Sequence, residues 1–213
     1  MAGPTVRERY ATLVTSKRSR VVHDNAAYLL HATAWRETSL VVQVLSREHG
    51  CVAMVAKGAK RPYSVLRPVL SAFQPLALSW TGSGDVKTLT RADVAGIRAL
   101  TGGAFMSGWY MNELLLRFLP REDAHPFLYD AYDAALMQLG KGDRAAGALR
   151  RFEWALLRET GYGLSGPEPD FEDTTAEPAL RKLLREKLAE QLAGRPLSTR
   201  RVLMEFQARF TDR

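Results

Sequence analysis

The sequence has 213 residues but only one cysteine, Cys51, and four widely spaced histidines. One cysteine excludes a disulfide framework and a multi-cysteine zinc site within the chain, and the histidine spacing indicates no metal site. No hydrophobic run approaches the length of a membrane span, about 18 residues. The first 25 residues are basic but lack the apolar stretch of a secretory signal. These absences predict a cytoplasmic protein with no membrane contact and no bound metal.

The sequence also lacks the common catalytic motifs. It contains no P-loop, no dinucleotide-binding glycine motif after a strand and no nucleophile elbow. Cys51 and His49 have no evident third partner, so a buried thiol beside a turn histidine is favoured over a nucleophile and its base. The densest acidic cluster lies in a linker at 163–175, whereas a metal-dependent nuclease needs carboxylates on rigid elements. We therefore expect no catalytic residue and no cofactor.

Positive charge is present in excess and is unevenly distributed. The chain has 30 lysines and arginines against 23 acidic residues, a net charge of +7. Residues 1–100 hold 14 of the basic and 6 of the acidic residues, while residues 101–213 hold 16 and 17. This asymmetry predicts a polyanion-binding first half and a nearly neutral second half. Residues 1–25 are interpreted as a basic mobile arm.

Residues 26–100 have the pattern of a small β-domain. Five short segments alternate in polarity or are rich in β-branched and aromatic residues. Glycine-containing turns separate the second from the third and the fourth from the fifth. The predicted strands are 27–34, 38–46, 51–56, 73–80 and 86–94. Five strands with one longer connection between the third and fourth indicate an OB-type barrel, although an SH3-like barrel would share most of these signals.

Helical periodicity replaces this pattern from residue 101 to the end. The first predicted helix, 104–119, is apolar on nearly every face and is expected to be the central buried helix of a bundle. Helices at 126–139 and 145–160 follow. Beyond the linker 163–175, Thr174 and Glu177 form an apparent capping box for another helix, and Ser198 caps a last one. The predicted fold class is α+β, with a five-stranded OB-type barrel (26–100) followed by an all-helical domain (101–213).

A basic loop after the third strand is the main candidate site. It places Lys57, Lys60, Arg61 and Arg67 within eleven residues, together with the aromatic Tyr63. Cations of this kind bind phosphates, and an aromatic ring stacks on bases. A solvated charged connection is the alternative interpretation.

The turn after the first strand adds Trp35 and Arg36. In an OB barrel this turn flanks the nucleic-acid groove, so both residues are expected at its rim. Packing of Trp35 at the barrel end is the alternative.

Two arginine pairs are weaker candidates for secondary contacts with DNA or a partner. Arg150 and Arg151 lie on a helix beside aromatic residues, where surface arginines flanking a core are the alternative. Arg200 and Arg201 lie near the start of the last helix, which opposes the helix dipole and therefore indicates an anionic partner.

The order and spacing of several short stretches resemble the bacterial recombination mediator RecO. These stretches are 36–40 (RETSL), 47–50 (REHG), 56–61 (AKGAKR), 73–76 (FQPL), 110–115 (YMNELL), 119–123 (LPRED), 150–153 (RRFE) and 161–164 (GYGL). Lys57, Lys60 and Arg61 match the basic stretch of that family. Many family members carry a longer interval before the last helices, often with four zinc-binding cysteines. Here the interval is only 165–175 and contains no cysteine, so zinc is not implied.

The resemblance implies a non-enzymatic role in recombinational repair. Proteins of this family bind single- and double-stranded DNA and anneal complementary strands. With RecR they help RecA to replace single-strand-binding protein, whose C-terminal tail is expected to contact the helical domain. From the residues themselves, an RNA-binding OB protein and, less favoured, a metal-dependent nuclease remain alternatives.

Overall fold

The computed structural model describes residues 21–142, 145–162, 164, 166–193 and 196–199. Its first half is a closed barrel in which the strands are adjacent in the order β1-β2-β3-β5-β4. The strands are β1 (Val21–Trp35), β2 (Ser39–Ser46), β3 (Gly50–Ala56), β4 (Pro75–Thr81) and β5 (Val86–Val94). All neighbours pair antiparallel except β3 and β5, which are parallel. This arrangement confirms the predicted OB-type fold.

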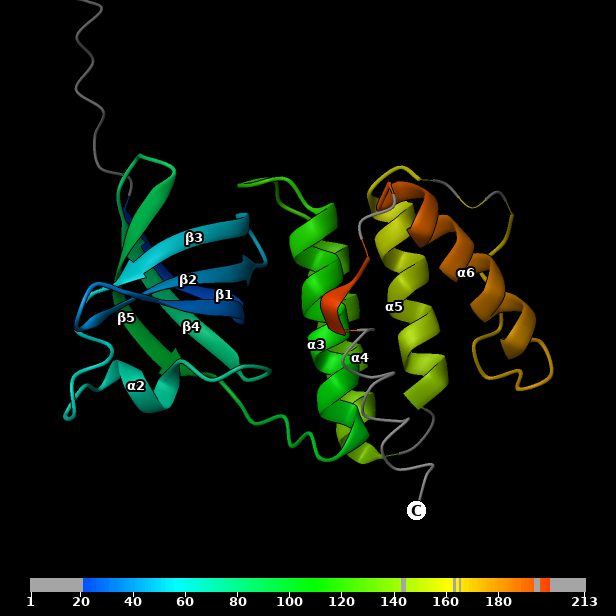
Figure 1. The fold of residues 1–213 in the computed structure, drawn as a ribbon, viewed down its shortest axis with the longest axis horizontal. Helices are drawn as coiled ribbons and strands as arrows, with labels where there is room; N and C mark the ends of the chain where they lie inside the picture. The colour runs from blue at the N-terminus through cyan, green and yellow to red at the C-terminus, as the bar shows by residue number, and fades with distance from the viewer. Residues whose placement is uncertain (1–20, 143–144, 163, 165, 194–195, 200–213) are drawn as a thin grey trace, which may run out of the picture.

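The helical half lies against one side of the barrel. It comprises α3 (Gly103–Phe118), α4 (Pro126–Lys141), α5 (Ala145–Glu159) and α6 (Glu177–Gln191), and a short helix α2 (Leu66–Val69) lies between β3 and β4. Figure 1 shows α3 and α4 beside the barrel, with α5 next and α6 farthest away. The predicted α+β class is therefore confirmed. No helix in the described residues is long and apolar enough to cross a membrane.

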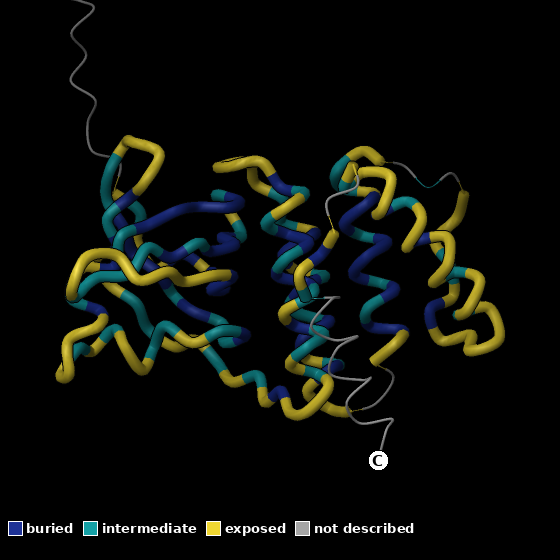
Figure 2. The backbone as a smooth tube through the Cα atoms, viewed as in Figure 1, coloured by how far each residue is buried: buried dark blue, intermediate teal, exposed yellow. Residues whose placement is uncertain are grey.

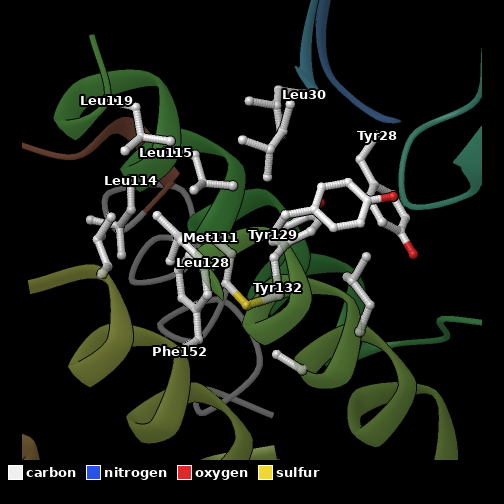
Figure 3. Close-up of a cluster of buried hydrophobic side chains, with 14 of the residues drawn as sticks. Tyr28, Leu30, Met111, Leu114, Leu115, Leu119, Leu128, Tyr129, Tyr132 and Phe152 are labelled. Carbon is white, nitrogen blue, oxygen red and sulfur yellow. The ribbon is translucent and has the colours of Figure 1, made fainter. Parts of the chain in front are cut away.

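Strand β1 contributes to two hydrophobic cores. Ala27 and Leu29 point into the barrel core, whereas Tyr28 and Leu30 belong to the core shared with the helices. Figure 3 shows Tyr28 and Leu30 among side chains of α3 and α4. The alternation of a strand places successive side chains on opposite faces, so one strand joins both domains.

Buried polar groups add specificity to this junction. The Asn112 side chain donates a hydrogen bond of 3.0 Å to the carbonyl oxygen of Leu30 and accepts one of 2.5 Å from the hydroxyl of Tyr132. The hydroxyl of Tyr28 donates to Asp133. Without these bonds the groups of Asn112, Tyr132 and Leu30 would be buried without a partner, so the contacts fix how the helices sit on β1.

The structure differs from the sequence-based boundaries at the start of the barrel. β1 begins at Val21, so residues 21–25, predicted to belong to the arm, are part of the strand. Asp24 has a φ of 45° and its N–H donates to the hydroxyl of Ser79, at an irregularity in the β1–β4 register. This irregularity interrupts the period-two alternation of polarity in residues 21–25, and for this reason the sequence pattern did not predict them as part of the strand. Residues 1–20 lie outside the described residues.

Two helix predictions also need correction. Thr174 is not the N-cap of α6, because the N-cap position is Ala176, with no side-chain cap; instead the Asp173 carboxylate accepts hydrogen bonds from Thr175 and from the N–H of Ala176. Helix α3 is not buried on nearly every face, since Phe105 and Trp109 are exposed. The last predicted helix lies almost wholly outside the described residues.

Candidate nucleic-acid interface

The basic loop is held on the barrel by its apolar residues and its own turns. Ala59 is 1% exposed and packs in the barrel core, and Leu66 of α2 packs against the same core. Gly58 has a φ of 70°, a conformation that favours glycine, and its carbonyl oxygen accepts a hydrogen bond of 3.0 Å from the N–H of Arg61. The backbone of the loop is thus fixed while its polar side chains remain outside.

The predicted contact residues of this loop are all exposed. Lys57, Lys60, Arg61, Tyr63 and Arg67 lie at the solvent surface. Figure 2 shows extended exposed stretches at the end of the barrel that faces away from the helices.

The β1–β2 turn lies directly beside the basic loop. The N–H of Lys60 donates a hydrogen bond of 2.9 Å to the carbonyl oxygen of Thr38. The turn that carries Trp35, which is 49% exposed, and Arg36 therefore lies at the same end of the barrel as the loop. Figure 1 shows the connection between β1 and β2 near the loop that precedes α2. Arg36 has a φ of 52°, an uncommon conformation for a residue other than glycine.

Ion pairs divide the nine lysines and arginines of residues 21–100 into two groups. Four pair with carboxylates: Arg47 with Asp130, Lys87 with Glu122, Arg91 with Asp93 and Arg98 with Asp133. The other five have no carboxylate at ion-pair distance in the described part of the chain. These five are Arg36, Lys57, Lys60, Arg61 and Arg67, which are the cations predicted to contact DNA.

Three of the four pairs join the barrel to the helical half. The guanidinium of Arg47 binds both carboxylate oxygens of Asp130 at 2.9 Å, and this contact lowers the pKa of Asp130. Lys87 and Arg98 each approach their carboxylates to 2.6 Å. Charge on the helix side of the barrel is thus neutralised, whereas the opposite end keeps its positive field, which attracts polyanions.

The secondary arginines are placed differently from one another. Arg150 is 8% exposed and its guanidinium lies 3.0 Å from the carboxylate of Glu153, which also accepts a hydrogen bond from Tyr110. Arg150 is therefore an interior residue and offers no surface to DNA in this conformation. Burial raises the pKa of Glu153, although Arg150 and Tyr110 favour its ionised form.

Arg151 is half-buried and contacts the ring of Phe171, with its guanidinium carbon 5.2 Å from the ring centroid. A packed position of this kind beside an aromatic ring matches the alternative interpretation of the pair, surface arginines flanking a core. Arg200 and Arg201 lie outside the described residues.

The structure also locates the groups considered for catalysis. Cys51 is buried where β3 meets the helices, and burial raises the pKa of its thiol to about 12, which disfavours the nucleophilic thiolate. Asp170 and Asp173 of the acidic linker accept backbone hydrogen bonds within their own turns. No group of three or more potential metal ligands occurs among the described residues.

Sequence reasoning missed two features of this surface. The contact of Lys60 with Thr38 is a backbone hydrogen bond between residues 22 positions apart, and no residue pattern reports such a bond. Val65, at 80% exposure, joins Tyr63 at the tip of the loop. The available signal for this exposure was the position of Val65 between Pro62 and Pro68, with Arg67 two residues further on.

Comparisons with known proteins agree with this architecture. Residues 21–98 match the family model described as "Recombination protein O N terminal", and residues 101–166 match "Recombination protein O C terminal". The chain is 53% identical over 165 residues to the DNA repair protein RecO of Cupriavidus metallidurans, covering 77% of this chain and 55% of that protein. It is 57% identical over 150 residues to that of Aromatoleum aromaticum, covering 70% and 62%.

A third relative is matched over nearly its whole length. The DNA repair protein RecO of Ralstonia nicotianae is 40% identical over 232 aligned residues, covering 87% of this chain and 85% of that protein. The chain thus spans less than two thirds of the first two relatives but more than four fifths of this one.

Proposed function

This chain belongs to the RecO family, and we propose that it acts in DNA repair as a recombination mediator that binds DNA and anneals complementary strands. In this proposal the protein is not an enzyme. It binds single- and double-stranded DNA at the basic end of the barrel and assists RecA loading onto strands covered by single-strand-binding protein.

The observation that carries this proposal is the position of the five cations that have no carboxylate partner among the described residues. Two DNA strands repel each other because each carries a phosphate charge at every nucleotide, and annealing requires that this repulsion be screened. Arg36 on the β1–β2 turn and the four cations of the basic loop supply the charge for this, and no covalent step is needed. Because these cations have no carboxylate at ion-pair distance among the described residues, they are available to phosphates.

Protein partners belong to the proposal as well. RecR and the C-terminal tail of single-strand-binding protein are the partners that the family resemblance implies, and RecA is reached indirectly. We place the contact with the tail on the helical half. Of the arginine pair Arg150 and Arg151, Arg150 is buried, so Arg151 is the one that can contact a partner at the surface.

The test is the annealing of two labelled complementary oligonucleotides coated with single-strand-binding protein, without ATP or added metal. We expect the wild-type chain to accelerate annealing and Arg61→Ala to slow it. Arg91→Ala is the matched control, because it removes one charge from the same domain at a site already paired with Asp93. A wild-type chain that binds DNA without accelerating annealing would contradict the mediator role, and a strong preference for RNA competitors would favour an RNA-binding function.

A further inference from the structure

The tip of the basic loop carries two exposed apolar side chains. Tyr63 is 98% exposed and Val65 is 80% exposed, so neither ring nor methyl groups pack on the protein. Single exposed apolar residues are common on protein surfaces. Here, however, two occur within three residues, on a loop whose cations have no carboxylate partner in the part of the chain that the structure describes.

The backbone beneath this tip is structured without help from a ligand. The N–H of Ser64 donates to the carbonyl oxygen of Arg61 at 3.1 Å, and the N–H of Arg67 donates to the carbonyl oxygen of Ser64 at 3.3 Å. The hydroxyl of Ser64 accepts a further bond of 3.3 Å from the N–H of Leu66, whose side chain packs against the barrel core. The two apolar side chains are therefore presented on a fixed turn.

The charges on both sides of the tip indicate what it contacts. Arg61 precedes Tyr63 and Arg67 follows Val65, so phosphates can be bound on either side of an apolar centre. In a nucleic acid, the apolar surface that lies between phosphates is the face of a base. Base faces inside a duplex are covered by their neighbours, and they become accessible at unpaired nucleotides.

Resting on the DNA-binding function proposed above, we infer that the loop tip recognises unpaired bases where single strand meets duplex. Tyr63 stacks on the first unpaired base, and Val65 packs as an apolar wedge beside it, while Arg61 and Arg67 hold the flanking phosphates. Aromatic stacking on bases is tolerant of sequence, and apolar wedges are known to separate neighbouring bases. The tip thereby distinguishes a junction from a plain duplex, which the cations alone do not.

The experiment compares a tailed duplex with a blunt duplex of equal phosphate number, each labelled for fluorescence anisotropy at one salt concentration. Tyr63→Ala is expected to lose about tenfold in affinity for the tailed duplex, because stacking on one base contributes about that factor. Its affinity for the blunt duplex is expected to remain unchanged. Tyr63→Phe keeps the ring and is the matched control, which should bind both duplexes as the wild type does. Val65→Ala should weaken only binding to the tailed duplex.

A photocross-link provides an independent measurement. With 5-iododeoxyuridine at the first unpaired position, the wild-type chain should cross-link through the peptide that contains Tyr63. All variants should melt at the wild-type temperature, because both side chains lie outside the cores.

Two results would overturn the inference: an equal loss for both duplexes in Tyr63→Ala, or no loss for the tailed duplex. If the wild type binds with salt-dependent affinity and Tyr63→Ala matches it, only this inference fails. If the wild type binds neither duplex, the proposed function fails as well.

Discussion

The N–H of Lys60 donates a 2.9 Å hydrogen bond to the carbonyl oxygen of Thr38 and thereby joins the basic loop to the β1–β2 turn. Because of this bond, Arg36 and the cations of the loop belong to one surface although they are far apart in the sequence. The opposite side of the barrel is neutralised by ion pairs with the helices. Affinity for DNA is therefore expected to depend on a defined subset of the basic residues.

The first prediction concerns the salt dependence of DNA binding. If the five cations contact about five phosphates, the slope of log K against log salt for a single strand is about −3.5, a loss of about a hundredfold between about 50 and 200 mM salt. Lys60→Ala with Arg61→Ala should make the slope shallower by about 1.4. Fluorescence anisotropy titrations at several salt concentrations measure this.

The control for this prediction is Arg91→Ala with Lys187→Ala, which also removes two charges, each already paired with a carboxylate. This control should retain the wild-type slope. An equal effect of both double variants would mean that net charge, and not the basic end of the barrel, determines binding.

The second prediction concerns the buried amide at the domain junction. Asn112→Ala leaves the hydroxyl of Tyr132 and the carbonyl oxygen of Leu30 without a partner, and each such group costs about 1–3 kcal/mol. The free energy of unfolding in urea should fall by about 2–6 kcal/mol. In a Tyr132→Phe background, Asn112→Ala should lower the free energy of unfolding by less. If the effects of the two substitutions were fully additive, the hydrogen bond between these side chains would not contribute to stability.

The third prediction compares two glycines with similar backbone conformations. Gly50 and Gly58 have φ of 66° and 70°, so alanine costs roughly 1–2 kcal/mol at either position. At Gly50 an added Cβ would also lie 1.8 Å from the carbonyl oxygen of Asp123, whereas at Gly58 its nearest contact would be 3.5 Å away. Gly50→Ala should therefore lower the melting temperature much more than Gly58→Ala. Equal decreases in melting temperature would show that the β2–β3 turn does not pack closely against the backbone of Asp123.

The fourth prediction is a pH dependence at the junction. The Arg47 guanidinium lowers the pKa of Asp130 below its ordinary value of 3.8, so the contact stabilises the fold above that value and its contribution is lost as pH falls through the lower, folded-state pKa. Asp130→Asn should melt slightly below the wild type at neutral pH, and the difference should vanish in strong acid. Because the pair is exposed, the difference should be small and should shrink in high salt. A difference that persists in strong acid would contradict this assignment.

The class of the fold and most element positions could be predicted from local residue patterns. Period-two alternation or enrichment in β-branched and aromatic residues predicted all five strands, and β5 falls at residues 86–94 as predicted. Helical periodicity with terminal glycines and prolines placed α3, α4 and α5 within a few residues. These signals are local, because each depends on side chains that repeat within one element.

Which charges are available to a ligand depends on how the two halves of the chain pack together. The sequence gives Arg47, Lys87 and Arg98 the same formal charge as Lys60, but the packing of helices on the barrel pairs the first three with carboxylates. It likewise buries Arg150 against Glu153 while Arg151 stays half-exposed, although the two are adjacent. Ion pairing and burial depend on residues brought together from distant parts of the chain, and no local pattern records those partners.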